Sequence, residues 1–276
     1  MTMKISRKGS RRPGTPQVQS NKDGRGKAGA MRDAGKAARP SASAPMHIPL
    51  EETRDRLSGA EAPVPGFLAD IVKEARRFFN EARGSHGWDH TERVLNLCLR
   101  IGKNEGADLE VLALAAVLHD IGRGEEDRTN GAVCHSQSGV RLARGLLKRH
   151  GVPERTAARV LHCIATHRFR KKAGRRSLEA KVLFDADKLD SIGATGIGRA
   201  FLFAGEIGAR LHDSNVDPAR TKPYTADDTA YREYLVKLNS IKDRIFTCEG
   251  RRIAESRHRF MVRFFDRLNK ENDGLV

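Results

Sequence analysis

The chain has 276 residues, of which 38% are hydrophobic and 31% are charged, enough apolar sequence to bury one core of ordinary size. No apolar run approaches the roughly 20 residues that cross a bilayer, and the N-terminus lacks the apolar segment of a signal peptide. The four cysteines are widely spaced and form no Cys-x-x-Cys pair, which favours free thiols, so we expect a cytoplasmic protein without membrane contact.

The net charge of +16 is concentrated at the N-terminus. Residues 1–50 hold eleven lysines and arginines against two aspartates and so contribute +9. This segment is rich in Gly, Ser, Pro and Ala and has almost no large apolar residue, so it cannot offset the entropy lost on ordering. We expect a disordered basic tail over residues 1–50. It is either an arm that attracts nucleic acid or, as we favour, a solvated extension or a stretch before a true start at Met31 or Met46.

Beyond the tail, apolar residues recur with helical spacing and nowhere alternate convincingly as in a strand. The expected fold class is therefore all-α. The predicted helices, in chain order, run over residues 67–83, from Asp89, from Asp108 towards Gly122, and over 135–150, 153–167, 178–189, 193–212, 227–247 and 250–271.

The second predicted helix places a histidine on its core-facing side. Asp89 is the expected N-cap, and His90 recurs with Val94, Leu97 and Ile101 at spacings of four, three and four residues. His90 therefore points inward from the N-terminal end of this apolar stripe.

The third predicted helix ends in a His-Asp pair. Its apolar stripe leads to His119, and Gly122 follows as a stop signal of the left-handed C′ type. His119 and Asp120 lie about 100° apart around the helix axis. At a helix end, both side chains can still reach one ion.

Three later helices also direct polar groups towards the core. His135 and His167 each stand at one end of an inward stripe, and Asp187 shares an otherwise apolar face with Leu183 and Phe184. An unpaired carboxylate is costly to bury, so we expect a cation beside Asp187.

His90, His119, Asp120 and Asp187 thus form a set of nitrogen and oxygen donors from three helices. One histidine on an apolar stripe is more often an ordinary core residue, but the coincidence on three stripes indicates a divalent-metal site. Such donors suit Mn²⁺, Fe²⁺, Co²⁺, Ni²⁺ or Mg²⁺ and leave positions for water and substrate. No thiolate is needed, which argues against a structural zinc.

At these residues the chain resembles the HD superfamily of metal-dependent phosphohydrolases. The similar segments are His90 with Arg93 and Val94, LHDIG at 118–122, DADKLD at 185–190 with IGA at 192–194, and the stretches 247–254 and 257–261. They look like a small bacterial and archaeal branch that includes enzymes splitting nucleoside triphosphates into monophosphate and pyrophosphate.

The resemblance implies an HD-type helical bundle over residues 66–271, with metal ligation by His90, His119, Asp120 and Asp187. Substrate identity does not carry over, because the superfamily spans phosphatases, phosphodiesterases, dGTP hydrolases and guanosine-tetraphosphate hydrolases.

The expected reaction is attack of a metal-activated water on phosphorus in a phosphate ester or phosphoanhydride, with a nucleotide as the favoured substrate. Asp120 is the expected catalytic carboxylate that orients this water. His135 and His167 are candidates for contacting phosphate or binding a second ion, or else are core histidines bonded to carbonyls. Lys188 and Arg123 are candidates for neutralising phosphate, or else are solvated cations.

His86 is expected to hydrogen-bond behind the first ligand, whereas Glu125 and Glu126 depart from the family spacing and receive no role. Two other classes of function stay open. A di-iron oxygenase on the same fold would need a larger ligand set that draws in His135 and His167. A non-catalytic metal or nucleotide sensor, or a nucleic-acid-associated protein, would keep the ion only as a binding feature. Hydrolysis with added Mn²⁺ or Ni²⁺ separates these alternatives.

Overall fold

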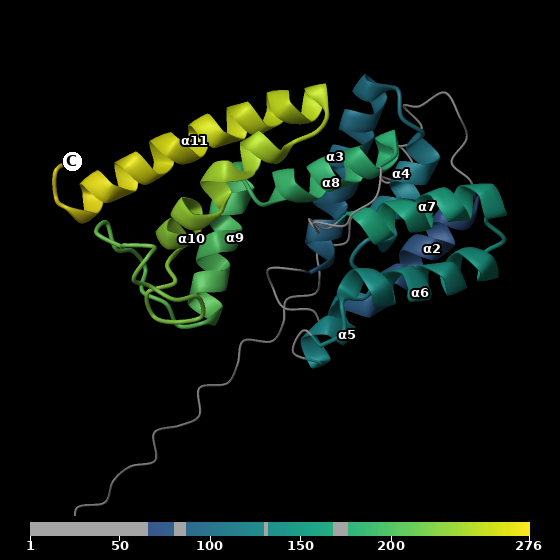
Figure 1. The fold of residues 1–276 in the computed structure, drawn as a ribbon, viewed down its shortest axis with the longest axis horizontal. Coiled ribbons are helices and arrows are strands. Elements are labelled where there is room, and N and C mark those ends of the chain that lie inside the picture. The colour runs from purple at the N-terminus through teal and green to yellow at the C-terminus, as the bar shows by residue number, and fades with distance from the viewer. Residues whose placement is uncertain (1–65, 80–86, 130–131, 168–175) are drawn as a thin grey trace, which may run out of the picture. The chain divides into compact units, whose positions relative to one another are not determined.

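The computed structural model describes residues 66–79, 87–129, 132–167 and 176–276, which all belong to one compact unit. The tail predicted over residues 1–50 and the side chain of His86 lie outside these ranges, so both stay predictions. The described part consists of helices and loops without a strand, which confirms the all-α prediction (Figure 1). None of its helices combines the length and apolar character needed to cross a membrane.

Ten α-helices and two 3₁₀ helices make up the described part of the chain. In order they are α2 (Gly66–Arg76), η1 (Arg77–Phe79), α3 (Trp88–Glu105), α4 (Leu109–Leu118), α5 (Arg123–Arg128), α6 (His135–Arg149), α7 (Glu154–Thr166), α8 (Leu178–Asp190), α9 (Gly193–Glu206), α10 (Ala230–Val236), η3 (Leu238–Arg244) and α11 (Cys248–Asn272).

Helix α4 lies in the interior and carries the residues that follow it into the core. All residues from Val111 to Leu118 are buried, because this segment is apolar on every side. Helices α3, α7 and α8 pack against it, and α3 also packs against α8. Since α4 ends within this core, the next two residues, His119 and Asp120, are also buried.

Side-chain caps fix where several of these helices begin. Asp108 accepts from the backbone of Glu110 and Val111 at the start of α4, and Ser177 and Thr247 cap α8 and α11 in the same way.

The predicted cap at Asp89 is wrong. Helix α3 has Gly87 at its N-cap, and Asp89 lies in the first turn, where its carboxylate accepts from Arg93 Nη1 at 2.6 Å. A carboxylate is also stabilised in a first turn by the partial positive charge of the helix N-terminus.

Three other predicted boundaries differ from the structure. The α-helix predicted over 67–83 ends at Arg76 and tightens into η1. The helix predicted over 193–212 ends at Glu206, because Gly208 adopts a left-handed φ of 70° and closes the last turn. The helix predicted over 227–247 is divided into α10 and η3, since Lys237 leaves the helical region with φ −141°.

Gly122 has a different role from the one predicted. Its φ is −84°, so it is no left-handed stop, and it lies at the N-cap of α5. A Cβ at this position would meet the carbonyl of His135 and would approach the backbone nitrogen of Gly139 to 2.6 Å. Gly122 therefore lets the turn after α4 lie directly against the first turn of α6.

Candidate metal centre

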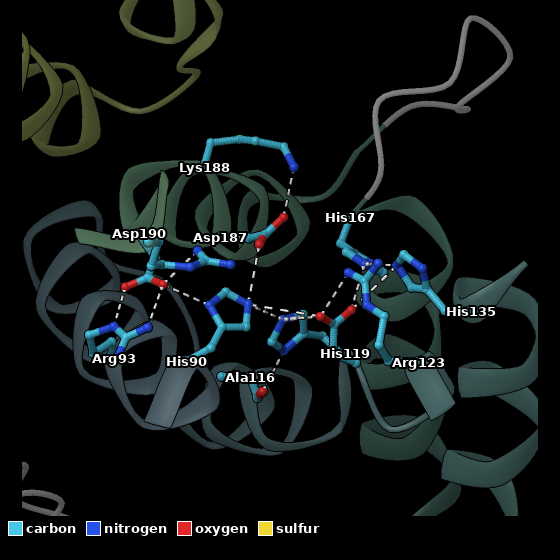
Figure 2. Close-up of polar contacts among 12 residues, drawn as sticks. His90, Arg93, Ala116, His119, Arg123, His135, His167, Asp187, Lys188 and Asp190 are labelled. Atoms are coloured by element: carbon cyan, nitrogen blue, oxygen red, sulfur yellow. Dashed lines mark hydrogen bonds and ion pairs between the residues drawn. The ribbon is translucent and has the colours of Figure 1, made fainter. Parts of the chain in front are cut away.

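Helix ends bring six predicted donor residues together in the core (Figure 2). His90 lies in the first turn of α3, and His119 and Asp120 directly follow α4. The other three are His135 at the start of α6, His167 just after α7, and Asp187 in the last turn of α8. Five of the six are at most 2% exposed, and the side chain of Asp187 is 17% exposed.

The first cluster consists of His90, His119 and Asp187. The Nε2 atom of His90 lies 3.3 Å from His119 Nε2 and 3.5 Å from Asp187 Oδ1. These spacings allow one atom of each side chain to contact a single ion.

The second cluster consists of Asp120, His135 and His167. The Nε2 atoms of the two histidines lie 3.3 Å apart, and Asp120 Oδ1 lies 3.3 Å from that of His135 and 3.7 Å from that of His167. In Figure 2, His135 and His167 lie on the opposite side of the site from His90.

The carboxylate of Asp120 lies between the two clusters. Its Oδ2 atom is 3.9 Å from His90 Nε2 and 3.7 Å from His119 Nε2, while Oδ1 faces His135 and His167. Asp120 therefore offers one oxygen to each cluster.

Hydrogen bonds at Nδ1 determine which ring nitrogen of each histidine faces the site. His119 Nδ1 donates to the carbonyl of Ala116, and His167 Nδ1 donates to the carbonyl of Ile164, each at 2.7 Å. A carbonyl oxygen can only accept, so both Nδ1 atoms carry hydrogen, and in a neutral ring Nε2 presents its lone pair.

The other two histidines are bound by carboxylates. His90 Nδ1 lies 2.7 Å from Asp190 Oδ2, and His135 Nδ1 lies 2.5 Å from Glu126 Oε2.

Burial lowers the pKa of two of the four histidines, His119 and His135, to about 4. The rings of His119 and His135 are therefore neutral at pH 7.

This arrangement fits a divalent cation. The Nε2 atoms of neighbouring rings face each other at 3.3 Å, and Asp120 Oδ1 is buried with no hydrogen-bond partner among the residues described. An unsatisfied buried carboxylate oxygen is costly. A cation between these atoms would supply the missing partner.

Asp190 supports the first cluster from behind. Besides His90, it accepts from Arg93 Nε at 2.6 Å and from Arg199 Nη1 at 2.9 Å, and it is 1% exposed. Although burial opposes ionisation, the bonds from His90 and Arg93 lower the pKa of Asp190 to about 2. The carboxylate therefore stays charged and fixes the orientation of the His90 ring.

Arg123 and Lys188 contact the carboxylates of the two clusters directly. Arg123 Nη2 donates to Asp120 Oδ2 at 3.0 Å, and Lys188 Nζ donates to Asp187 Oδ2 at 2.8 Å. Burial alone would raise both aspartate pKa values, but these cations keep the pKa of Asp120 and of Asp187 well below the ordinary range. Both carboxylates are therefore ionised.

A pocket of about 370 Å³ opens onto both clusters. His90, His135, His167 and Asp187 form part of its wall. The cationic side chains in the wall are Arg123, Lys188, Arg199, Lys237 and Arg244. Such a lining attracts an anion with several charges.

Residues 87–192 match the family model described as HD domain. YpgQ of Bacillus subtilis (strain 168) is 36% identical over 194 residues, which cover 69% of this chain and 86% of YpgQ. The chain belongs to the HD superfamily.

Solved structures agree with this assignment. The crystal structure of Bacillus subtilis YpgQ in complex with ADP has 32% sequence identity and a TM-score of 0.59, over 74% of this chain and 94% of that one. A structure of an HD-superfamily hydrolase from Bacillus thuringiensis has 26% identity and a TM-score of 0.59, over 75% and 96%. The chain therefore has an HD-superfamily hydrolase fold together with clusters of metal-binding residue types.

Two acidic residues to which the sequence interpretation gave no role hold members of the two clusters. Asp190 follows Asp187 by three residues and so lies on the same side of α8, a spacing that was visible in the sequence. Glu126, which departed from the family spacing, binds both His135 and Arg123, at 2.5 Å and 3.1 Å. Glu125 instead pairs with Arg141 at the surface.

Proposed function

We propose that the chain is a metal-dependent phosphohydrolase that cleaves a phosphoanhydride or phosphate ester bond, most favourably in a nucleotide. The observation that carries this proposal is the set of inward Nε2 atoms and carboxylate oxygens, with Asp120 Oδ1 unsatisfied, beside a pocket lined by cations. Donors for a divalent metal and a wall for phosphate thus occur together.

In this proposal His90, His119, Asp187 and Oδ2 of Asp120 would hold one ion. His135, His167 and Oδ1 of the same aspartate would hold a second. A bound divalent ion supplies a Lewis acid that polarises a phosphoryl oxygen and lowers the pKa of water by several units.

The residues of the chain supply positioning and charge. Asp120 is ionised and lies between the clusters, so it can accept a hydrogen bond from the attacking water and orient it. Arg123 donates to Asp120 and also lines the pocket, where it and Lys188 can approach the phosphate oxygens.

Two observations support a nucleotide as substrate. The pocket wall offers five cationic side chains, more than a single phosphate monoester requires. The relative YpgQ was crystallised in complex with ADP. The six clustered donors would also satisfy the larger ligand set of a di-iron oxygenase, but the cationic wall favours hydrolysis of phosphates over oxidation of an uncharged substrate.

The test is a substrate panel on protein loaded with Mn²⁺ or Ni²⁺. Nucleoside triphosphates, nucleoside diphosphates and p-nitrophenyl phosphate are compared, and products are identified as phosphate or pyrophosphate. We expect hydrolysis of a nucleoside triphosphate that disappears with a chelator and in Asp120→Asn. Asp127→Asn is the matched control, since this exposed aspartate lies seven residues further along the chain and outside the cluster. Absence of metal-dependent turnover across the panel would reject the proposal.

A further inference from the structure

A second pocket adjoins the cationic one. It has a volume of about 280 Å³ and lies between α9, the loop before α10, and the start of η3. Ser191, Arg199 and Lys237 line both pockets, so the two spaces share a rim. A molecule whose charged end occupies the cationic pocket can thus extend into the second one.

The wall of the second pocket is aromatic and apolar. Phe203 and Tyr224 contribute rings whose centroids lie 5.9 Å apart at an angle of 77°, and Ala200, Pro223 and Leu238 add apolar surface. Tyr224 is 73% exposed, so most of its ring is available for contact with a bound molecule. A planar aromatic group could therefore stack on it.

The backbone around Tyr224 is held firmly in an unusual conformation. Tyr224 is the one non-glycine residue with positive φ in the described part of the chain, at 61°. Its N–H donates to Asp228 Oδ2 at 2.8 Å, and the other oxygen of Asp228 accepts from Arg232 Nη1, also at 2.8 Å. Arg232 is anchored in turn to Thr221. This network holds the backbone from which the Tyr224 ring projects.

The two pockets differ in charge. The cationic pocket has five cationic side chains in its wall and one carboxylate, that of Asp187. In the second, Asp228 and Glu233 balance Arg199 and Lys237, which lie on the shared rim. Phosphates therefore favour the first pocket, and an uncharged group is better suited to the second.

We propose that the second pocket binds the nucleobase of a nucleotide whose phosphates lie in the cationic pocket, and that Tyr224 stacks on this base. The inference rests on the proposed function and extends it by assigning the part of the site that recognises a nucleoside. Stacking on an aromatic side chain accepts any of the nucleobases, because every base has a flat face.

The experiment measures binding, so that it does not depend on turnover. Calorimetric titrations of Mn²⁺-loaded protein with ADP and with inorganic pyrophosphate compare two ligands that share a diphosphate and differ in the nucleoside. Tyr224→Ala should weaken ADP binding about tenfold and leave pyrophosphate binding unchanged, and Tyr224→Phe should restore ADP binding. Phe260→Ala removes an exposed aromatic ring on α11 outside both pockets and is the matched control.

The inference is overturned if Tyr224→Ala leaves ADP binding unchanged, if it weakens pyrophosphate binding equally, or if the wild-type protein does not bind ADP. Thermal unfolding of each variant shows whether the loop has kept its fold. If the wild-type protein hydrolyses no substrate of the panel but the Tyr224 variants show the expected binding, the proposed reaction is rejected and the base site is supported.

Discussion

The two donor clusters are built alike, yet they differ in how many ligands each has to itself. In each, one histidine is held by a carbonyl three residues earlier and the other by a carboxylate that also binds an arginine. The first cluster has its own carboxylate, Asp187, whereas the second has only the shared Asp120. Its supporting acid, Glu126, is also more exposed than Asp190, at 16% against 1%. Because fewer charged donors mean weaker metal binding, the first cluster should bind its ion more tightly.

The largest effect is expected from Asp120→Asn, which removes the charge that both clusters share. The amide keeps the size and most of the hydrogen-bonding capacity of the side chain, so the fold should survive. Turnover at saturating Mn²⁺ should fall on the order of a thousandfold, with little change in thermal unfolding without added metal. Near wild-type hydrolysis would make Asp120 a structural residue and remove the main support for the phosphohydrolase.

His119→Ala is the companion variant to that prediction. It removes a donor and also opens space at the buried end of α4, so it should lower stability as well as turnover. Equal unfolding temperatures for Asp120→Asn and His119→Ala would contradict the separate roles assigned to the two neighbouring residues.

The next largest effect is expected on metal retention, where one variant in each cluster distinguishes the two clusters. After dialysis, the wild-type protein should retain the more tightly bound ion, Asp187→Ala should retain none, and His135→Ala should retain it while losing the second ion seen at high Mn²⁺. Metal analysis at low and high Mn²⁺ measures both steps. Identical metal contents for Asp187→Ala and His135→Ala would show that the clusters are not independent sites of different strength.

A smaller effect is expected from the residues behind the ligands. Replacing a carboxylate that orients a metal-binding histidine typically costs about 10- to 100-fold in metal affinity. Asp190→Asn should weaken the first ion and Glu126→Gln the second, with the larger loss for Asp190, which is more buried and also holds Arg93 and Arg199. Titration of metal-free protein with Mn²⁺ measures both constants, and an inverted order would contradict the comparison.

The smallest effect is expected from deletion of residues 1–45. Their composition gives them no means of packing, so metal content, helicity and turnover of small substrates should stay close to those of the full chain. Circular dichroism, metal analysis and a turnover assay on the shortened chain provide the measurement. A collapse of turnover would mean that both clusters depend on the tail.

Much of the donor set could be predicted because each histidine ends a regular apolar stripe. His90, His119 and Asp187 needed only helical periodicity to be placed inside, and the structure does bring them within reach of one another. Asp190 was not assigned, because its role depends on a partner that tertiary packing supplies, and Glu126 was not assigned, because its spacing departs from that of the family. Asp190 meets His90 across 100 residues of sequence.

Helix ends and irregular segments were harder to predict. The end of α9 at Glu206 depends on the left-handed Gly208, and the break at Lys237 has no Gly or Pro to signal it. Tyr224 lies in a loop without periodicity, and only the hydrogen bond from its backbone N–H to Asp228, four residues further on, reveals that its backbone is held. The chemistry of the site was thus more visible in the sequence than the surfaces beside it.

Gly122 determines more than the course of one turn. Because hydrogen replaces a side chain there, the segment carrying Asp120 can lie against the backbone that carries His135, with the Oδ1 and Nε2 atoms 3.3 Å apart. A Cβ at this position would meet the backbone of His135 and Gly139, so the turn after α4 and the start of α6 would have to separate. This separation should lengthen the gap between Asp120 and His135 in the second cluster. If each cluster holds an ion as proposed, a single methyl group at position 122, far smaller than any ligand replacement, should weaken binding of the second ion.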